Sequence, residues 1–99
     1  MISKPEFITR VKELKSFKSK TGNSYSDLSL VGNILSFKRA STGECWKLSI
    51  EEVYKIYLKE NYFNTVVIRK YMNGRVYSPS LGLLMATGLC DEEGNRKNK

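Results

Sequence analysis

The sequence predicts an α+β fold with an N-terminal helix, a three-stranded antiparallel meander, and two or three short helices packed on one face of the sheet. Apolar residues recur at helical spacing near the N-terminus and again after residue 49, whereas turn residues at hairpin spacing divide the stretch between them. The 99 residues, 40% of them hydrophobic, suit one domain with one core. We expect this domain to span residues 1–90, followed by a flexible charged tail over residues 91–99.

The first helix is predicted over residues 4–19. Ser3 and Glu6 have the spacing of a capping box, and Pro5 is tolerated in the first turn. One face of this helix is apolar and is formed by Phe7, Ile8, Val11, Leu14 and Phe17. The opposite face and its flank carry Lys12, Lys15 and Lys18. Lysines on the solvent-exposed face of a helix are usually solvated and inert, so their position on this helix alone does not indicate a binding site.

Residues 25–49 are predicted to form the meander. Gly32 and Asn33 are typical of a two-residue hairpin turn, and residues 40–43 are typical of a longer loop. Together these turns predict that Leu28 faces Phe37 and that Asp27 faces Lys38. The buried face is then formed by Leu28, Leu30, Leu35, Phe37, Trp46 and Leu48. The open face carries Ser29, Ser36, Lys38, Cys45 and Lys47.

The helix after the meander has the clearest pattern in the chain. Ser49 and Glu52 form a second capping box, and Asn61 marks the expected end. Its apolar face, which should cover the sheet, is formed by Ile50, Val53, Tyr54, Tyr57 and Leu58.

The last third of the chain allows two interpretations. In the first, Thr65 caps a short helix, and Ser78 opens another helix that ends at Gly88. In the second, Asn73 and Gly74 form a hairpin turn between two strands. We favour the helical interpretation because the apolar residues fit helical spacing better than strand alternation; they are Val67, Ile68, Tyr71 and Met72.

Charge is the strongest indication of function. Seventeen Lys and Arg against ten Asp and Glu give a net charge of +7, and such a field attracts polyanions. We therefore predict a small nucleic-acid-binding accessory or regulatory protein that acts mainly through phosphate contacts, with DNA favoured over RNA. The candidate contact residues are Lys12, Lys15, Lys18, Lys38, Lys47, Arg69, Lys70 and Arg75. On the helical interpretation, residues 49–73 have the outline of a helix-turn-helix.

An alternative from another class is a non-enzymatic interaction module that docks on an acidic protein, such as an inhibitor encoded by a phage or a mobile element. Tyr and Arg are enriched in protein interfaces, and the chain has six Tyr. Exposed and clustered tyrosines would favour this alternative, whereas a continuous basic stripe would favour nucleic acid. The tyrosines whose exposure distinguishes the two alternatives are Tyr25, Tyr62, Tyr71 and Tyr77.

The residue inventory narrows the chemistry. The chain has no His and two Cys, too few ligands for a structural zinc site, and no nucleotide-binding or nucleophile motif. We therefore expect no enzymatic activity, no metal and no cofactor. No apolar run is long enough to span a bilayer, and the N-terminus lacks the apolar stretch of a signal peptide. We expect a cytoplasmic protein without membrane contact, and the composition leaves the oligomeric state open.

Overall fold

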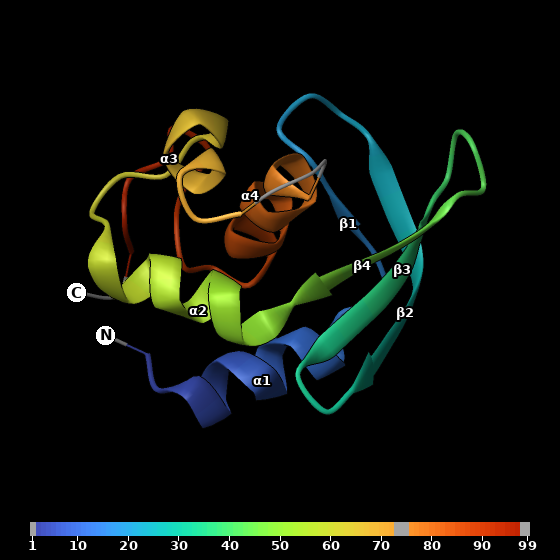
Figure 1. Ribbon diagram of the computed structural model, residues 1–99, viewed down its shortest axis with the longest axis horizontal. Helices are drawn as coiled ribbons and strands as arrows, with labels where there is room; N and C mark the ends of the chain where they lie inside the picture. Colours follow the sequence, from blue (N-terminus) through green and yellow to red (C-terminus); the bar gives the residue numbers. More distant parts are fainter. Residues whose placement is uncertain (1, 73–75, 98–99) are drawn as a thin grey trace.

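The computed structural model describes residues 2–72 and 76–97 and confirms the α+β fold. A four-stranded antiparallel sheet, ordered β1-β2-β3-β4, lies beside a layer of helices (Figure 1). The predicted meander corresponds to β2, β3 and β4, and β1 is a very short additional strand. In chain order the elements are α1 (Lys4–Glu13), β1 (Phe17–Lys18), β2 (Ser24–Val31), β3 (Ile34–Arg39), β4 (Cys45–Ser49), α2 (Ile50–Lys59), α3 (Thr65–Arg69) and α4 (Tyr77–Ala86).

Helix α1 begins where the sequence predicts but ends earlier. The Ser3 hydroxyl accepts a hydrogen bond from the Glu6 N–H at 3.3 Å, as in an N-cap. The helix ends at Glu13 rather than at residue 19, because Leu14 is in an extended conformation. The last part of the predicted helix instead leads into β1.

Burial of Phe17 explains the early end of α1. Phe17 pairs with Tyr25 across β1 and β2, and its ring centroid lies 5.0 Å from that of Tyr25 and 5.5 Å from that of Phe37. Aromatic pairs at these separations add to the free energy of burial. The helical spacing of Phe17 in the sequence was therefore misleading, because the ring is buried by the sheet.

Close to both predicted turns, the strands pair in the predicted register. Leu30 pairs with Leu35 beside the first turn, and Phe37 pairs with Trp46 in the second hairpin. The Gly32 backbone has a φ of 61°, the left-handed conformation that a tight hairpin turn requires. Trp46 lies on the core side of the sheet, where its ring is 6.5 Å from that of Tyr25.

A β-bulge in β2 changes the register farther from the turn. The pairing shifts between Ser26 and Ser29, so Lys38 pairs with Ser26 and not with Asp27 as predicted. Asp27 has a φ of 54°, which places it in the left-handed region at the bulge. The extra residue reverses the side-chain alternation and turns Tyr25 into the core, where it is 1% exposed. Leu28, predicted to face Phe37, lies within this irregular stretch, for which no regular pair is formed.

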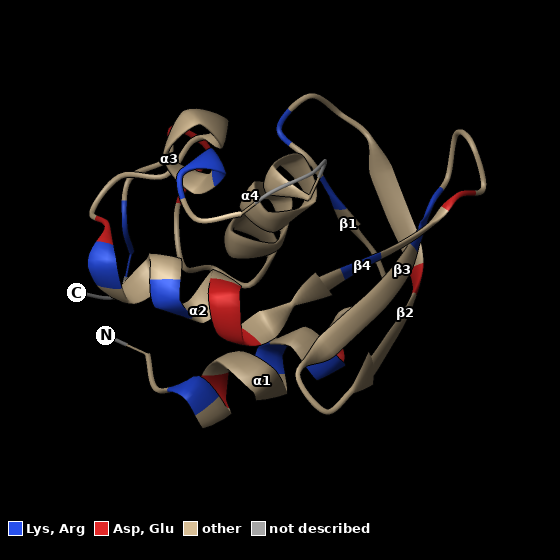
Figure 2. Ribbon diagram, viewed as in Figure 1, with Lys and Arg blue, Asp and Glu red and all other residues tan. Residues whose placement is uncertain are grey.

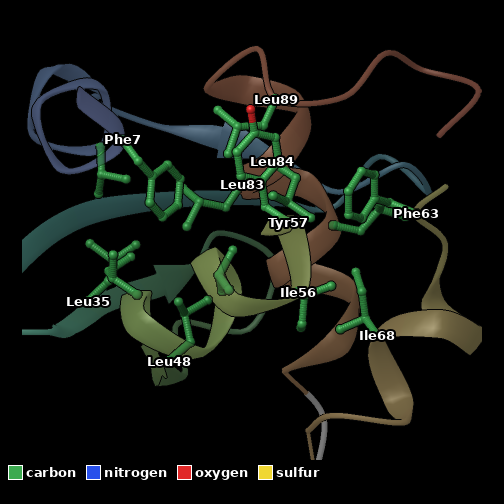
Figure 3. Close-up of a cluster of buried hydrophobic side chains, with 14 of the residues drawn as sticks. Phe7, Leu35, Leu48, Ile56, Tyr57, Phe63, Ile68, Leu83, Leu84 and Leu89 are labelled. Carbon is green, nitrogen blue, oxygen red and sulfur yellow. The ribbon is translucent and has the colours of Figure 1, made fainter. Parts of the chain in front are cut away.

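The core lies between the sheet and the helices. Helix α2 begins at the predicted N-cap, since the Ser49 hydroxyl accepts a hydrogen bond from the Glu52 N–H at 3.3 Å. Leu58, predicted to be in the apolar face, is 44% exposed, whereas Ile56 is fully buried. Figure 3 shows buried side chains from both ends of the chain and from the elements between them packed together, among them Phe7, Leu35, Tyr57, Leu84 and Leu89.

The last third of the chain is helical, as favoured above. Asn64, and not Thr65, caps α3, because its side-chain oxygen accepts a hydrogen bond from the Val67 N–H at 2.8 Å. Helix α4 ends before Gly88, whose φ of 79° matches the predicted stop. Residues 73–75, which include the alternative hairpin turn, lie outside the described residues.

Residues 91–97 differ from the expected separate tail, because they pack against the end of α2 and the segment after it. Asn95 forms an antiparallel bridge with Tyr62, and the Phe63 N–H donates to the Gly94 carbonyl at 2.7 Å. Arg96 is 9% exposed, and its guanidinium donates to the carbonyls of Tyr57 and Glu60. The reason is chemical, since the last carbonyls of a helix lack partners within the helix and a guanidinium supplies several donors.

Candidate nucleic-acid interface

The open face of the sheet contains two of the predicted contact residues side by side. Lys38 pairs with Cys45, and Ser36 pairs with Lys47, so all four lie on the face turned away from the core. Both lysines are exposed. Because they are diagonal neighbours on paired strands, their backbone positions are about 7–8 Å apart across the two strands. The open face, defined here as Ser29, Ser36, Lys38, Cys45 and Lys47, is therefore as predicted.

The charge on this face is predominantly positive. Asp27 is the one acidic residue within β2, β3 and β4. Its carboxylate lies 3.9 Å from the Lys38 Nζ, and both side chains are more than half exposed. A pair this long and this exposed contributes little free energy, so it leaves Lys38 available to another anion.

The open face also extends to an apolar pair at the hairpin end. Val31 pairs with Ile34 next to the turn, and these side chains are 74% and 43% exposed. Because alternate residues of a strand point to the same side, Ile34 shares a face with Ser36 and Lys38. Neither residue was among the sequence candidates, although their position beside Gly32 and Asn33 would have allowed the assignment.

Lys12 and Lys15 lie elsewhere. Lys12, on α1, lines a shallow hollow of about 230 Å³ together with Leu28 and Leu30, which point to the core side of the sheet. Lys15 is exposed and lies in the connection between α1 and β1. The sheet therefore separates Lys12 from the open face.

Lys18 borders a cleft of about 840 Å³ next to β1, α4 and the C-terminal segment. Hydrogen bonds from the backbone N–H groups of Asn95 and Glu93 hold the pKa of the Asp91 carboxyl below its ordinary value, so this carboxylate is ionised at neutral pH. Acidic and basic side chains both line the cleft, namely Lys18, Lys20, Lys97, Asp91, Glu92 and Glu93. This balance of charge makes the cleft a poor site for a polyanion.

Arg69 and Lys70 lie at the C-terminal end of α3, and Arg75 lies outside the described residues. The Arg69 guanidinium stacks on the Tyr77 ring, 4.6 Å from its centroid. With 5 residues, α3 is about 7.5 Å long, and the N-terminal part from which a recognition helix contacts bases is apolar, with Val66 and Val67. The helix-turn-helix interpretation is therefore not supported by the geometry.

Within residues 2–72 and 76–97, the basic residues are distributed over several elements of the fold. Figure 2 shows Lys and Arg spread from α1, at the bottom of the view, to α3, at the top, and along β1 and β4. The three basic groups that the sequence indicated lie on different elements, with Lys12 on α1, Lys38 on β3 and Arg69 on α3. Lys38 and Lys47 lie in register on the open face of β3 and β4, and neither strand contains an acidic residue.

The two cysteines differ in their environment. Cys45 is exposed on the open face, whereas Cys90 is 1% exposed. Burial, together with the charge of Asp91, raises the pKa of the Cys90 thiol to about 11. Near pH 8 we expect Cys45 to react with Ellman's reagent within minutes and Cys90 to react only on unfolding, because roughly one Cys90 in a thousand is a thiolate. Equal rates for both thiols in the folded protein would contradict the described burial.

Residues 2–72 and 76–97 contain neither a metal-binding cluster nor a membrane-spanning helix. No cluster of three or more His, Cys, Asp or Glu side chains able to hold a metal ion occurs there, and none of the helices has the length and apolar character needed to cross a bilayer. The chain has no match among models of known families, curated proteins or solved structures, so the open face itself is the basis for a functional proposal.

Proposed function

We propose that this protein binds nucleic acid through the open face of its sheet, with phosphate groups against Lys38 and Lys47. The observation that carries this proposal is the register that places these exposed lysines on one uncovered face of β3 and β4. Ser29 and Ser36 flank them on the same face, and serine hydroxyls are common donors to phosphate oxygens.

The other basic groups fit a polyanion less well. Three acidic residues line the cleft beside Lys18. Lys12 is separated from Lys38 by the sheet, and Arg69 is already stacked on Tyr77. These positions add to the positive field that attracts a polyanion without forming a surface along which its backbone can lie.

The alternative of docking on an acidic protein required exposed and clustered tyrosines. Tyr25 is buried, and Tyr62 is 46% exposed. Tyr71 is half-buried and donates a 2.5 Å hydrogen bond to Glu60, while Tyr77 is half-buried under Arg69. Since one of the four is exposed, the tyrosines do not favour a protein-docking surface.

The proposal is tested by removing the two charges of the open face. We expect the Lys38→Gln/Lys47→Gln double variant to bind DNA more weakly at low salt in a fluorescence-anisotropy titration. Each lost lysine removes a phosphate contact, so the slope of log K against log salt should become less steep by about 1.8 for a duplex or about 1.4 for a single strand. Both side chains are exposed, so the fold should be unaffected.

A charge-matched control distinguishes a site from net charge alone. Lys12→Gln/Lys15→Gln removes the same number of charges from exposed positions outside the sheet. If this control weakens binding as much as the open-face variant, a general field and not the open face causes the affinity. If the unaltered protein binds neither duplex nor single-stranded polymers at low salt, the proposed function is wrong.

A further inference from the structure

An exposed apolar pair borders the lysines of the open face. Single exposed apolar side chains are common on proteins, but Val31 and Ile34 are direct cross-strand neighbours that lie together in the open. Lys47 has two diagonal neighbours on β3, which are Ile34 on one side and Lys38 on the other. The backbone position of each is about 7–8 Å from that of Lys47, measured across the two strands. The open face is thus apolar at the hairpin end and cationic farther along the strands.

This order of side chains matches the chemistry of an unpaired nucleotide strand. Such a strand presents charged phosphates and, within a few ångströms of them, apolar base faces that are not stacked inside a duplex. Phosphates against Lys38 and Lys47 would leave the neighbouring bases beside Val31 and Ile34. No aromatic side chain lies on the described open face, so the base contact is aliphatic.

The surroundings of the hairpin disfavour a duplex. The Ile50 N–H donates to the Asn33 carbonyl at 2.8 Å, so α2 begins directly beside the turn. Ile34 is also paired with Ser49 of β4. The backbones of three adjacent strands span about 9.6 Å. Side chains and α2 add to this width, so the hairpin end of the sheet is too wide to enter a major groove of about 12 Å. The hairpin therefore cannot insert alone, and the bases of a duplex stay out of reach of Val31.

We infer that the nucleic acid bound by the open face is single-stranded, with its bases packed against Val31 and Ile34 and its phosphates against Lys38 and Lys47. The inference rests on the proposed function and adds the class of nucleic acid and a second pair of contact residues.

The test compares oligo(dT), oligo(U) and a DNA duplex of equal length in anisotropy titrations at low salt. We expect at least tenfold tighter binding of a single strand than of the duplex. Val31→Thr/Ile34→Thr should weaken single-strand binding about fivefold to tenfold while the salt slope is unchanged, because threonine keeps the β-branched shape and no charge is altered. Val66→Thr on α3, where the side chain is 62% exposed, is the matched control and should have no effect.

The outcomes separate the inference from the proposed function. Equal affinity for duplex and single strands, or no loss of affinity in Val31→Thr/Ile34→Thr, overturns the inference while the Lys38 and Lys47 result still supports the function. Sedimentation of the unaltered protein and of this variant provides a second readout. If the unaltered protein is a dimer and the variant a monomer, the apolar pair is a self-association contact and the inference is wrong. Absence of binding to any polymer overturns both.

Discussion

Replacement of Arg96 by alanine is expected to destabilise the domain by about 3 kcal/mol, because hydrogen bonds to a charged group contribute about 1.5–3 kcal/mol each. The guanidinium donates to the carbonyls of Tyr57 and Glu60 at the end of α2, and its Cζ lies 4.8 Å from the centroid of the Tyr57 ring. The substitution leaves these buried carbonyls with fewer partners and removes the link between α2 and the C-terminal segment. Urea denaturation followed by circular dichroism measures the loss.

Arg96→Lys provides the matched comparison. Lysine keeps the charge, but it is a point donor and cannot present the planar fork that reaches both Tyr57 and Glu60. We expect a loss between that of alanine and zero. Lys97→Ala, at the exposed neighbouring position, should change stability by less than about 0.5 kcal/mol. A loss below about 1 kcal/mol for Arg96→Ala would show that the C-terminal segment is not held by this side chain.

Replacement of Gly82 by alanine should also destabilise the protein, by about 1–3 kcal/mol. Intrinsic helix propensity predicts the opposite, since alanine is favoured over glycine within a helix by about 1 kcal/mol. A Cβ at this position would lie 2.5 Å from the Lys18 carbonyl oxygen and 3.0 Å from the Ser19 Cα. Those atoms are backbone, so α4 must move away from β1. Urea denaturation gives the free energy of unfolding of the variant.

A second glycine separates steric contact from other effects of alanine. A Cβ at Gly43 would meet no atom within 4 Å, although the φ of 72° disfavours a side chain. Gly43→Ala should therefore cost only the strain of the left-handed conformation, of order 1–3 kcal/mol, and should leave the contact of α4 with β1 intact. Hydrogen exchange at the Ser19 amide, which donates to Asn23 at 2.9 Å, should accelerate in Gly82→Ala and not in Gly43→Ala. A gain of stability in Gly82→Ala would contradict the close packing.

The distribution of the basic residues over several elements has a consequence for binding. A net charge of +7 would suggest many phosphate contacts, but the open face offers Lys38 and Lys47. The salt dependence of binding should therefore be shallower than the net charge implies, since the slope follows the phosphates neutralised at the interface. Apolar contacts at Val31 and Ile34 would add affinity that salt does not weaken.

Local signals in the sequence were sufficient for the elements whose determinants lie within a few residues. Ser49 and Glu52 cap α2 within one turn, and Gly32 sets the hairpin through its own backbone conformation. From that turn follow the positions of Lys38 and Lys47 on one face, which is why this part of the candidate site was predictable. The alternation of a strand needs only its register, and the turn supplies the register.

Features that depend on distant partners were not predictable. Phe17 fits a helical face in the sequence but is buried by Tyr25 and Phe37, which follow later in the chain. No turn residues in the sequence indicate the bulge at Asp27, which is stabilised by the burial of Tyr25 in the core. Arg96 resembles a solvated tail residue until the carbonyls at the end of α2 are placed beside it.

By itself, then, the sequence determined the fold class, the N-caps of α1 and α2, the hairpin turns, and the cationic open face with Lys38 and Lys47. Tertiary structure alone decided where α1 ends, that residues 91–97 pack on the domain, and which surfaces the basic residues of α1, α3 and the sheet occupy. The physical reason is the sequence separation over which each interaction acts, since caps and turns depend on residues that are close together in the chain. Burial and surface charge instead depend on which distant segments meet, and the free energy of those contacts outweighs the weak local preference.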